Sequence, residues 1–321
     1  MTATPFGIPV VNDSNKDAHG SRVSGALRVL MRILIAIPHA FRPRTDSLLS
    51  SETASKREQK QIALRETLLG NLDRFRDRCV VHRYTHGRWI SQTTPCEGDR
   101  ARLMVHHCPT WSLLPAALEG VALPPELSVV THNLADPSQL PMRVTQHCLE
   151  TAMADPDIDL VVYLEDDLAV LDRDLPAKVQ HLVQTFGEDY LFMPHRCETR
   201  PGLGDVVLAG EPLNDGTQRP WATWATGEQL QLDWLGRTHT FVRGVNPHAG
   251  CFWMTRQQAV RAHSYWTERR WTPDYTWVGP LEMACTGLFL PIFRMMKIVP
   301  EQARFFHLHH CDALWEGIPE A

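Results

Sequence analysis

The chain of 321 residues is long enough for one large domain or two small ones, and its 43% apolar and 21% charged residues are ordinary for a soluble globular protein. The net charge of -5 at pH 7 gives no electrostatic reason to expect nucleic acid as a partner. The eight cysteines are scattered and none forms a CxxC pair. This spacing argues against a structural zinc site and favours reduced thiols in a cytoplasmic compartment.

The two ends of the chain are expected to lie outside the folded part. Residues 1–25 are polar and small and lack a basic-then-apolar signal pattern, so we interpret them as a disordered tail, and 313–321 as a short C-terminal tail. No stretch is predicted to span a membrane, because the apolar residues 26–41 are interrupted by Arg28 and Arg32 and are too few. These arginines offer only a weak patch for peripheral contact with the inner face of a membrane.

The first half of the chain alternates between apolar runs and amphipathic segments. Residues 29–38, VLMRILIAIP, are predicted to form the first core strand, which Pro38 ends because proline donates no ladder hydrogen bond. The elements predicted next are a helix at 55–78, strands at 79–84 and 127–131, and a helix at 141–154. The proline-containing segment 89–125 predicts loops and a short helix. This alternation favours an α/β fold with a Rossmann-like, mostly parallel central sheet and flanking helices.

The most informative stretch is 159–170, DLVVYLEDDLAV, in which an apolar run leads directly to Glu165, Asp166 and Asp167. An apolar run of this length without alternation is typical of a buried strand in a parallel sheet. Three adjacent carboxylates repel one another unless a cation lies among them, and Mg²⁺ or Mn²⁺ prefers oxygen ligands. Ligands of open α/β sheets bind beyond the carboxyl ends of the strands, so we predict a divalent metal site that holds a phosphorylated donor.

The second half of the chain contributes further elements and a cluster of aromatic residues. The predicted elements are a helix at 176–186, a strand at 189–194, a helix at 256–266 and a strand at 297–299. Seven of the ten tryptophans lie within 221–277, and we expect most of them in the core and one or two at a binding surface. Gly244 and Gly250 allow a backbone to approach a ligand closely. Gly279 and Pro280 place Glu282 in the first turn of a helix.

The order of these pieces resembles that of GT-A glycosyltransferases, which carry a DxD motif and use nucleotide-sugar donors. The segments that carry the resemblance are the opening strand 29–38, LEDD at 164–167, HAGCFWM at 248–254 with GPLE at 279–282, and FHLHH at 306–310. The resemblance implies one catalytic domain over 26–312. Its nucleotide-sugar-binding half would be 26–195 and its acceptor-binding half 196–312.

The resemblance also implies a metal site of Mn²⁺ or Mg²⁺ at the residues that match the family's motifs. Asp167 would be the main ligand, Glu165 would be a ligand or face the ribose or a metal-bound water, and Asp166 would orient them. One histidine among 307, 309 and 310 would complete the site, and we favour His309. Glu165 departs from the aspartate that begins the family's motif, and its longer side chain puts direct ligation by it in doubt.

Further residues are candidates for donor binding and catalysis. Pro38 and His39 lie at the predicted sheet edge where a nucleotide would bind, and Arg143 and Gly250 are further candidate donor contacts. Glu282 is the candidate general base, which would imply an inverting reaction, with Asp274 as a second candidate. If the enzyme retains configuration, Glu282 would position or stabilise the reacting groups instead.

Each candidate has a purely structural explanation as well. The other acidic triplets, which begin at residues 155, 157 and 172, lie in turns or at helix starts, whereas the triplet at 165–167 ends an apolar run. Glu282 would also be favourable as a helix cap, and His39 and Arg143 as solvated side chains. The late histidines would alone fit a surface turn.

These observations favour a glycosyltransferase that moves a sugar from a nucleotide-sugar donor to a hydroxyl of a glycan, lipid or protein acceptor. One alternative is a metal-dependent nucleotidyltransferase, although residues 39–44 lack the glycine typical of a triphosphate-binding loop. Another is a carbohydrate-binding or scaffold protein of the same fold without activity. The intact triplet and the late histidines count against this second alternative.

Overall fold

The structure is a computed structural model that describes residues 30–42, 54–75, 78–95, 99–200, 202, 204–208, 224–244 and 246–312. The predicted tails 1–25 and 313–321 lie outside these ranges, as do Arg28, Arg44 and Trp221. No helix in the described part of the chain combines the length and apolarity that crossing a bilayer requires.

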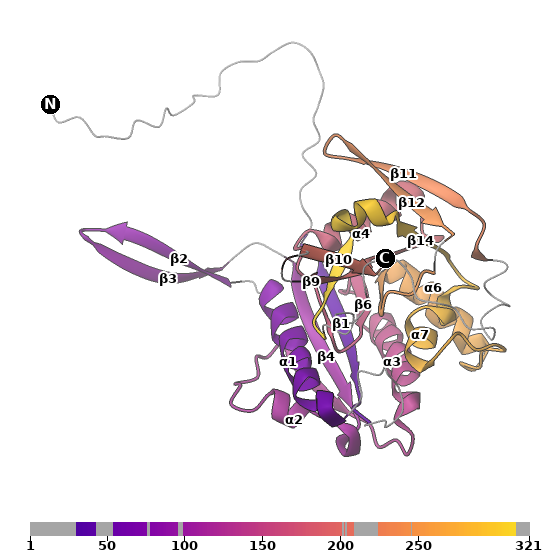
Figure 1. The fold of residues 1–321 in the computed structure, drawn as a ribbon, viewed down its shortest axis with the longest axis horizontal. Coiled ribbons are helices and arrows are strands. Elements are labelled where there is room, and N and C mark those ends of the chain that lie inside the picture. Colours follow the sequence, from indigo (N-terminus) through magenta and orange to yellow (C-terminus); the bar gives the residue numbers. More distant parts are fainter. Residues whose placement is uncertain are drawn as a thin grey trace, which may run out of the picture.

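A five-stranded sheet in the order β13-β6-β1-β4-β5 occupies the centre of the molecule (Figure 1). Its strands are β1 (Arg32–His39), β4 (Arg100–His107), β5 (Leu127–Thr131), β6 (Leu160–Leu164) and β13 (Cys251–Thr255). The four strands β6, β1, β4 and β5 are mutually parallel, and β13 is antiparallel to β6. This arrangement confirms the predicted α/β fold with a mostly parallel central sheet.

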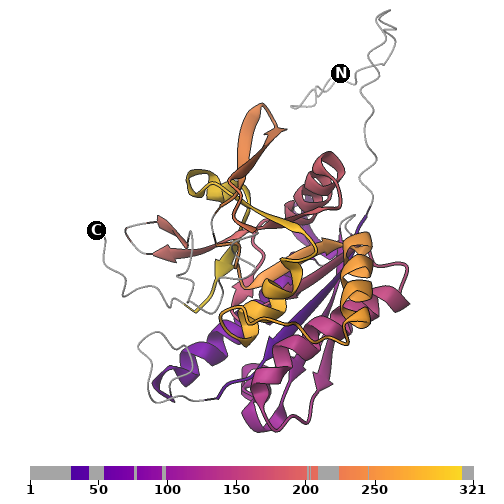
Figure 2. The same cartoon turned by 90° about the vertical axis from the view of Figure 1, so that its right-hand side faces the viewer.

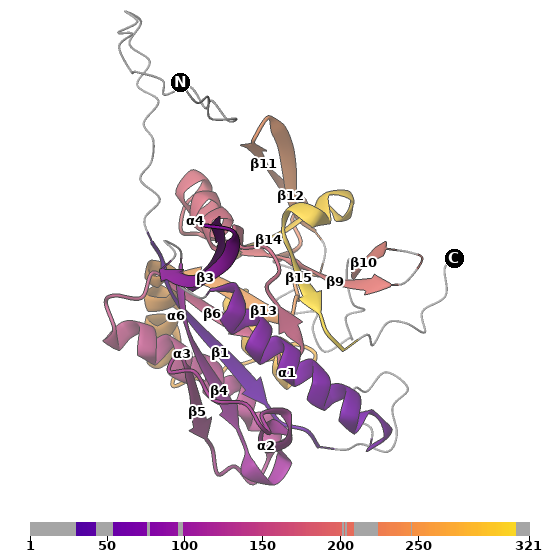
Figure 3. The same ribbon diagram turned by 90° about the vertical axis from the view of Figure 1, so that its left-hand side faces the viewer.

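Helices cover both faces of this sheet, as Figures 2 and 3 show from opposite sides. One face carries α3 (Leu140–Ala154), α6 (Arg256–Glu268) and α7 (Pro280–Cys285), and the other carries α1 (Arg57–Arg74) and α2 (Leu114–Ala117). The start of α6 is fixed by a capping box, in which Thr255 and Gln258 each accept a hydrogen bond from the other's backbone N–H. Short 3-10 helices cover Ala54–Lys56, Pro109–Trp111, Pro137–Gln139, Gly287–Phe289 and Pro300–Phe305.

Two smaller sheets lie beside the central one, in the orders β10-β9-β15-β7 and β11-β12-β14-β8. Their strands are β7 (Leu168–Ala169), β8 (Tyr190–Met193), β9 (His195–Arg200), β10 (Gly204–Leu208), β11 (Glu228–Trp234), β12 (Arg237–Arg243), β14 (Arg294–Ile298) and β15 (His307–His310). Helix α4 (Leu175–Phe186) connects β7 to β8. The acidic triplet therefore lies between β6 of the central sheet and β7 of a second sheet.

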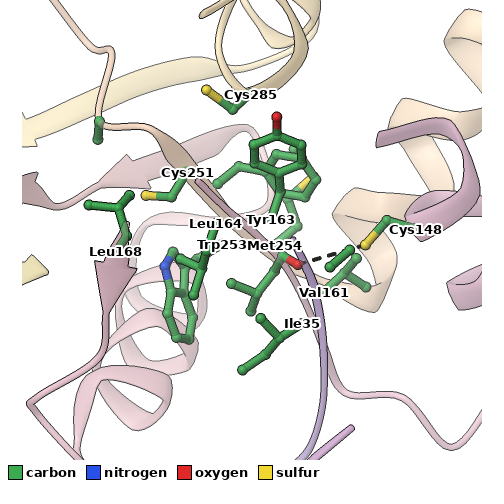
Figure 4. Close-up of a cluster of buried hydrophobic side chains, with 14 of the residues drawn as sticks. Ile35, Cys148, Val161, Tyr163, Leu164, Leu168, Cys251, Trp253, Met254 and Cys285 are labelled. Carbon is green, nitrogen blue, oxygen red and sulfur yellow. Dashed lines mark hydrogen bonds between the residues drawn. The ribbon is translucent and has the colours of Figure 1, made fainter. Parts of the chain in front are cut away.

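The core forms where the central strands meet the helices. Figure 4 shows Ile35 of β1, Val161, Tyr163 and Leu164 of β6, and Trp253 and Met254 of β13 packed together. Cys148 of α3 joins them, and its thiol donates to the carbonyl of Val162 at 3.8 Å. The tryptophans at 224, 253, 266 and 277 are at most 2% exposed, so four of the six tryptophans of 221–277 that the structure describes belong to the core, as expected.

Strands β2 (Arg78–Thr85) and β3 (Arg88–Pro95) form a hairpin that projects from the body (Figure 1). Tyr84 and Trp89 are 63% and 69% exposed and stack edge-to-face with ring centroids 5.3 Å apart. The segment 79–84 is therefore a strand, as predicted, but it belongs to a hairpin outside the core.

The prediction of loops and a short helix for 89–125 was wrong in one respect that matters for the site. This segment contains β4, which pairs with β1 at the centre of the sheet. Arg100 and Arg102 occupy the exposed positions at the start of β4 and break its apolar run, so the sequence pattern is that of a half-buried strand.

Candidate functional site

The carboxyl ends of four parallel strands meet at one edge of the central sheet. His39 at the end of β1 lies opposite His107 at the end of β4, which in turn lies opposite Thr131 at the end of β5. Strand β6 ends at the same edge and leads into Glu165 and Asp167, which are 8% and 7% exposed. Parallel strands all end on the same side, so the sheet itself gathers these polar groups.

Lys60 lies among the acids at the centre of the site. Its ammonium Nζ is 2.6 Å from Asp167 Oδ2, 3.4 Å from Asp166 Oδ1 and 3.5 Å from Asp312 Oδ2. Burial alone would lower the pKa of Lys60, but these three carboxylates raise it well above its usual value. Burial would also raise the pKa of Asp167, but Lys60 and His310 outweigh it and lower that pKa. Both groups are therefore charged at neutral pH.

His310, rather than the predicted His309, lies beside Asp167. Its Nε2 is 3.6 Å from Asp167 Oδ2, and its Nδ1 is 2.7 Å from Glu198 Oε1. The pairing of β15 with β7 places His310 opposite Leu168, next to the triplet. Successive side chains of a strand face opposite sides, so His309 is directed away from the face that His310 occupies.

The charge of His310 gives a testable pH dependence. Burial lowers the pKa of His310, but Asp167 and Glu198 outweigh this effect and raise it from 6.5 to about 9. Because the folded state holds this proton more tightly, the stabilisation is fully present below pH 6.5 and is lost as the pH rises through about 9. The free-energy advantage of the wild type over His310→Gln in urea unfolding should shrink by at most about 3 kcal/mol from about pH 6 to about pH 9.5. An advantage that stays constant over this range would contradict a charged His310, and His307→Gln on the same strand controls for loss of an imidazole.

Glu165 is held by a second set of partners, Arg196 and His248. Arg196 Nη1 lies 3.6 Å from Glu165 Oε2, and His248 Nε2 lies 3.8 Å from Oε1. The backbone N–H of Glu165 donates to the carbonyl of Gly250 at 2.8 Å. Burial, assisted by the charges of Asp167 and Glu282, raises the pKa of Glu165 to about 8 against the opposing effect of Arg196. The pKa of Glu165 is thus shifted in the opposite direction from that of Asp167.

Asp166 is oriented by His39, whose tautomer the surrounding contacts define. The backbone N–H of Leu113 donates to His39 Nε2 at 2.8 Å, so this nitrogen carries the lone pair. His39 Nδ1 therefore carries the proton and donates to Asp166 Oδ2 at 2.6 Å. Both nitrogens of this fully buried imidazole are used within the protein. We predicted that His39 contacts the nucleotide-sugar donor. In the structure it supports Asp166 instead.

The remaining predicted residues, namely Glu282, Pro38, Arg143 and Asp274, lie in different parts of the fold. Glu282 occupies the first turn of α7 and is half-buried, and its charge contributes to the raised pKa of Glu165. Pro38 is buried within β1. Arg143 is exposed on α3, where its charge helps to lower the pKa of His132. Asp274 is exposed in the segment before α7.

The donor atoms of the site are of the types that Mg²⁺ and Mn²⁺ accept. Asp167 Oδ1 and Asp312 Oδ1 are buried and have no hydrogen-bond partner within the described residues, and His310 supplies an imidazole beside them. In the described part of the chain, however, no three His, Cys, Asp or Glu side chains stand arranged to hold a metal ion. Lys60 lies between Asp167 and Asp312 instead. The ligand types fit a divalent cation, but the Lys60 ammonium occupies the position that such a cation would take.

Sequence reasoning missed Lys60, Arg196, Glu198 and Asp312. A signal for Lys60 was present, because it falls on the stripe of α1 that otherwise buries Ala63, Leu64, Leu68 and Leu72. A charged residue in an apolar stripe needs a buried partner. Arg196 and Glu198 lie within β9 and Asp312 follows β15, and nothing in their local sequence shows that these strands lie beside the triplet.

A second polar group at the same edge was also missed, namely three histidines. His106 Nδ1 lies 2.9 Å from His132 Nε2, and the rings of His106 and His147 are 5.1 Å apart. Burial, together with the neighbouring imidazoles, lowers the pKa of His106 to about 3. His106 is therefore uncharged at neutral pH, in contrast to Asp167.

No family model and no curated protein matches the chain. Solved structures with a distant likeness include 4-diphosphocytidyl-2C-methyl-D-erythritol synthase, with 10% identity, a TM-score of 0.34 and coverage of 86% of this chain and 97% of that chain. The synthase of the same name from Anaerococcus prevotii DSM 20548 has 8% identity, a TM-score of 0.35 and coverage of 89% and 96%. CMP:2-keto-3-deoxy-manno-octonic acid synthetase complexed with CTP has 9% identity, a TM-score of 0.32 and coverage of 83% and 89%. Likenesses at these TM-scores carry no argument about this chain, so the proposals below rest on its own residues.

Proposed function

We propose that this protein is a glycosyltransferase that binds a nucleotide-sugar donor at the carboxyl edge of its central sheet. The observation that supports this most is the buried group of Asp167, Asp312 and His310, in which two carboxylate oxygens lack a hydrogen-bond partner within the described residues. A buried carboxylate oxygen without a hydrogen-bond partner is costly, and a divalent cation bound beside it would lower this cost. A donor diphosphate supplies the anionic oxygens that share such a cation.

In this proposal Mn²⁺ or Mg²⁺ would be held by Asp167, Asp312 and, once it has released its Nε2 proton, His310, and would neutralise the charge that develops on the diphosphate. Asp166, oriented by His39, would fix the shape of the turn that presents Asp167. The raised pKa of Glu165 favours its protonated form, in which its carboxyl would donate a hydrogen bond to the nucleotide sugar. Arg196 lies beside Glu165 and adds a positive charge to the site.

The acceptor would approach from the side of α7, where Glu282 is half-buried. During transfer the bond between the anomeric carbon and the phosphate oxygen breaks, and the nucleoside diphosphate leaves with the electron pair. The acceptor oxygen forms the new bond to the anomeric carbon and gives its proton to the Glu282 carboxylate. Attack from the face opposite the leaving group inverts the configuration at this carbon.

A thermal-shift panel of nucleotide sugars, with and without Mn²⁺, tests this proposal on the full chain. Any ligand that binds only the folded state raises the free energy of unfolding by RT ln(1 + [L]/Kd). The unfolding midpoint rises as a result. We expect one nucleotide-sugar class to stabilise the protein, and more strongly with Mn²⁺. A panel that includes nucleoside triphosphates separates the alternative, because stabilisation by a triphosphate alone would favour a nucleotidyltransferase. No stabilisation by any member would favour a scaffold protein.

The replacement Glu282→Gln tests the proposed general base. Glutamine keeps the size of the side chain but cannot accept the acceptor's proton, so turnover should fall by about 10²- to 10⁴-fold. Donor affinity should change far less, because Glu282 faces the acceptor side in this proposal. Steady-state kinetics with the stabilising donor, together with donor titration, separate the two effects. Unchanged turnover would make Glu282 a helix cap in the first turn of α7.

A further inference from the structure

Lys60 is a charged residue that the protein buries inside its own candidate metal site. Its side chain is 7% exposed, and it extends from the apolar stripe of α1 to the end of β6. It contacts Asp166, Asp167 and Asp312 at once, at 2.6 to 3.5 Å. A divalent cation that bound Asp167 and Asp312 would have to occupy the same space.

We propose that Lys60 is a built-in counter-ion that competes with a divalent cation for Asp167 and Asp312, and that the cation enters together with a nucleoside diphosphate whose phosphate oxygens then receive the Lys60 ammonium. This inference rests on the proposed metal site of the function above and assigns two residues to it, Lys60 and Asp312. It makes the binding of metal and the binding of diphosphate depend on each other.

The charges around Lys60 give the physical reason for competition. Buried carboxylates repel one another, so removal of the single ammonium that all three contact would leave Asp166, Asp167 and Asp312 without this compensation. With Lys60 in place the cluster can fold without any metal. A metal that arrives alone must displace a buried ammonium from Asp167 and Asp312, and that ammonium then keeps only Asp166 as an anionic partner.

A diphosphate changes this balance because it supplies the missing anion. Its oxygens bind the metal and also accept hydrogen bonds from a displaced ammonium. Each ligand therefore raises the affinity of the site for the other, and by linkage the factor is the same in both directions. The flexible four-carbon stem of lysine allows the ammonium to move between two anionic partners while the backbone of α1 stays in place.

The test measures Mn²⁺ binding to the full-length protein by the electron paramagnetic resonance signal of free Mn²⁺. The variants are Lys60→Met, which removes the ammonium at similar volume, and Lys60→Arg, which keeps the charge. Lys56→Met, half-buried one turn earlier in the chain, is the matched control. The probes are Mn²⁺ alone, and Mn²⁺ with UDP, GDP, CDP or ADP.

We expect Lys60→Met to bind Mn²⁺ alone at least about tenfold more tightly than the wild type, with Lys60→Arg and Lys56→Met close to the wild type. For the wild type, one of the nucleoside diphosphates should tighten Mn²⁺ binding at least about fivefold. If Lys60→Met is unstable without metal, Mn²⁺ should raise its unfolding midpoint more than it raises that of the wild type, which supports the same conclusion.

Equal Mn²⁺ affinity of the wild type and Lys60→Met would overturn the inference, as would tight Mn²⁺ binding by Lys60→Arg or no Mn²⁺ binding by any variant. Failure of the proposed function has a different signature. In that case Lys60→Met binds Mn²⁺ more tightly than the wild type, but no nucleotide sugar or nucleoside diphosphate stabilises either protein.

Discussion

Replacement of Asp167 by asparagine should reduce turnover by a factor on the order of a hundred or more, since loss of one fixed electrostatic contact in an active site typically has this effect. Asp167 contacts Lys60 at 2.6 Å and His310 at 3.6 Å, and its second oxygen is buried without a hydrogen-bond partner within the described residues. Asparagine keeps the shape of the side chain but removes the charge that a cation requires. The measurement is kcat/KM with the donor that the thermal-shift panel identifies.

Two controls separate loss of the site from loss of the fold. Asp157→Asn alters an exposed carboxylate in the turn before β6, next to Arg32, and should leave turnover within about twofold. Asp167→Asn itself should unfold at lower denaturant concentration than the wild type, because the buried Lys60 keeps only Asp166 and Asp312 as partners. Circular dichroism at the assay temperature shows whether it is folded there. Full activity of folded Asp167→Asn would remove this residue from the site.

The second large effect is expected at Gly250, where alanine should destabilise the protein by about 2 kcal/mol or more. The φ angle of Gly250 is +64°, a conformation that costs an alanine about 1–2 kcal/mol. A Cβ atom at this position would also lie 2.5 Å from Glu165 Oε2 and 2.9 Å from Leu168 Cδ1. Glu165 or the backbone must therefore move, so donor affinity should fall as well.

Gly244→Ala is the matched control for Gly250→Ala. A Cβ atom at Gly244 would have its nearest neighbour, the Cα of Gly227, at 3.9 Å, which is an ordinary contact distance. We expect this variant to stay within about 0.5 kcal/mol of the wild type in urea unfolding, with unchanged donor affinity. If both variants were equally stable, the close packing of Gly250 against Glu165 would not hold in solution.

Much of the fold could be predicted because its elements have clear periodicity. The apolar run before Glu165 predicted β6, and the amphipathic segment 55–78 predicted α1 at Arg57–Arg74. Strand β4 was missed because its apolar run is short. Arginines alternate with buried residues at its start, and two histidines form its last two positions. Strand β2 was predicted, but its sequence does not reveal that its exposed side chains belong to a projecting hairpin.

The candidate site was predictable only at its centre. The triplet follows a buried strand of a parallel sheet, and this fixes its place at the carboxyl edge. Its partners come from distant parts of the chain: Lys60 is separated from Asp167 by 107 positions, and His310 from Glu198 by 112. Which of two adjacent histidines faces the triplet depends on the register of β15 against β7. A single sequence does not determine that register, so His309 and His310 were equivalent until the strand pairing was known.

The short strand β7 has a consequence for how the protein matures on the ribosome. Its two residues pair with β15, which is the last strand that the structure describes. Residues 165–167 are synthesised long before 307–312, so a nascent chain carries Asp167 without its partner His310 until the final strand is made. We therefore expect the candidate site to be completed late in folding, because its contacts join widely separated parts of the sequence. Premature termination ahead of β15 would leave the central sheet without His310, one of the two groups that compensate the charge of Asp167.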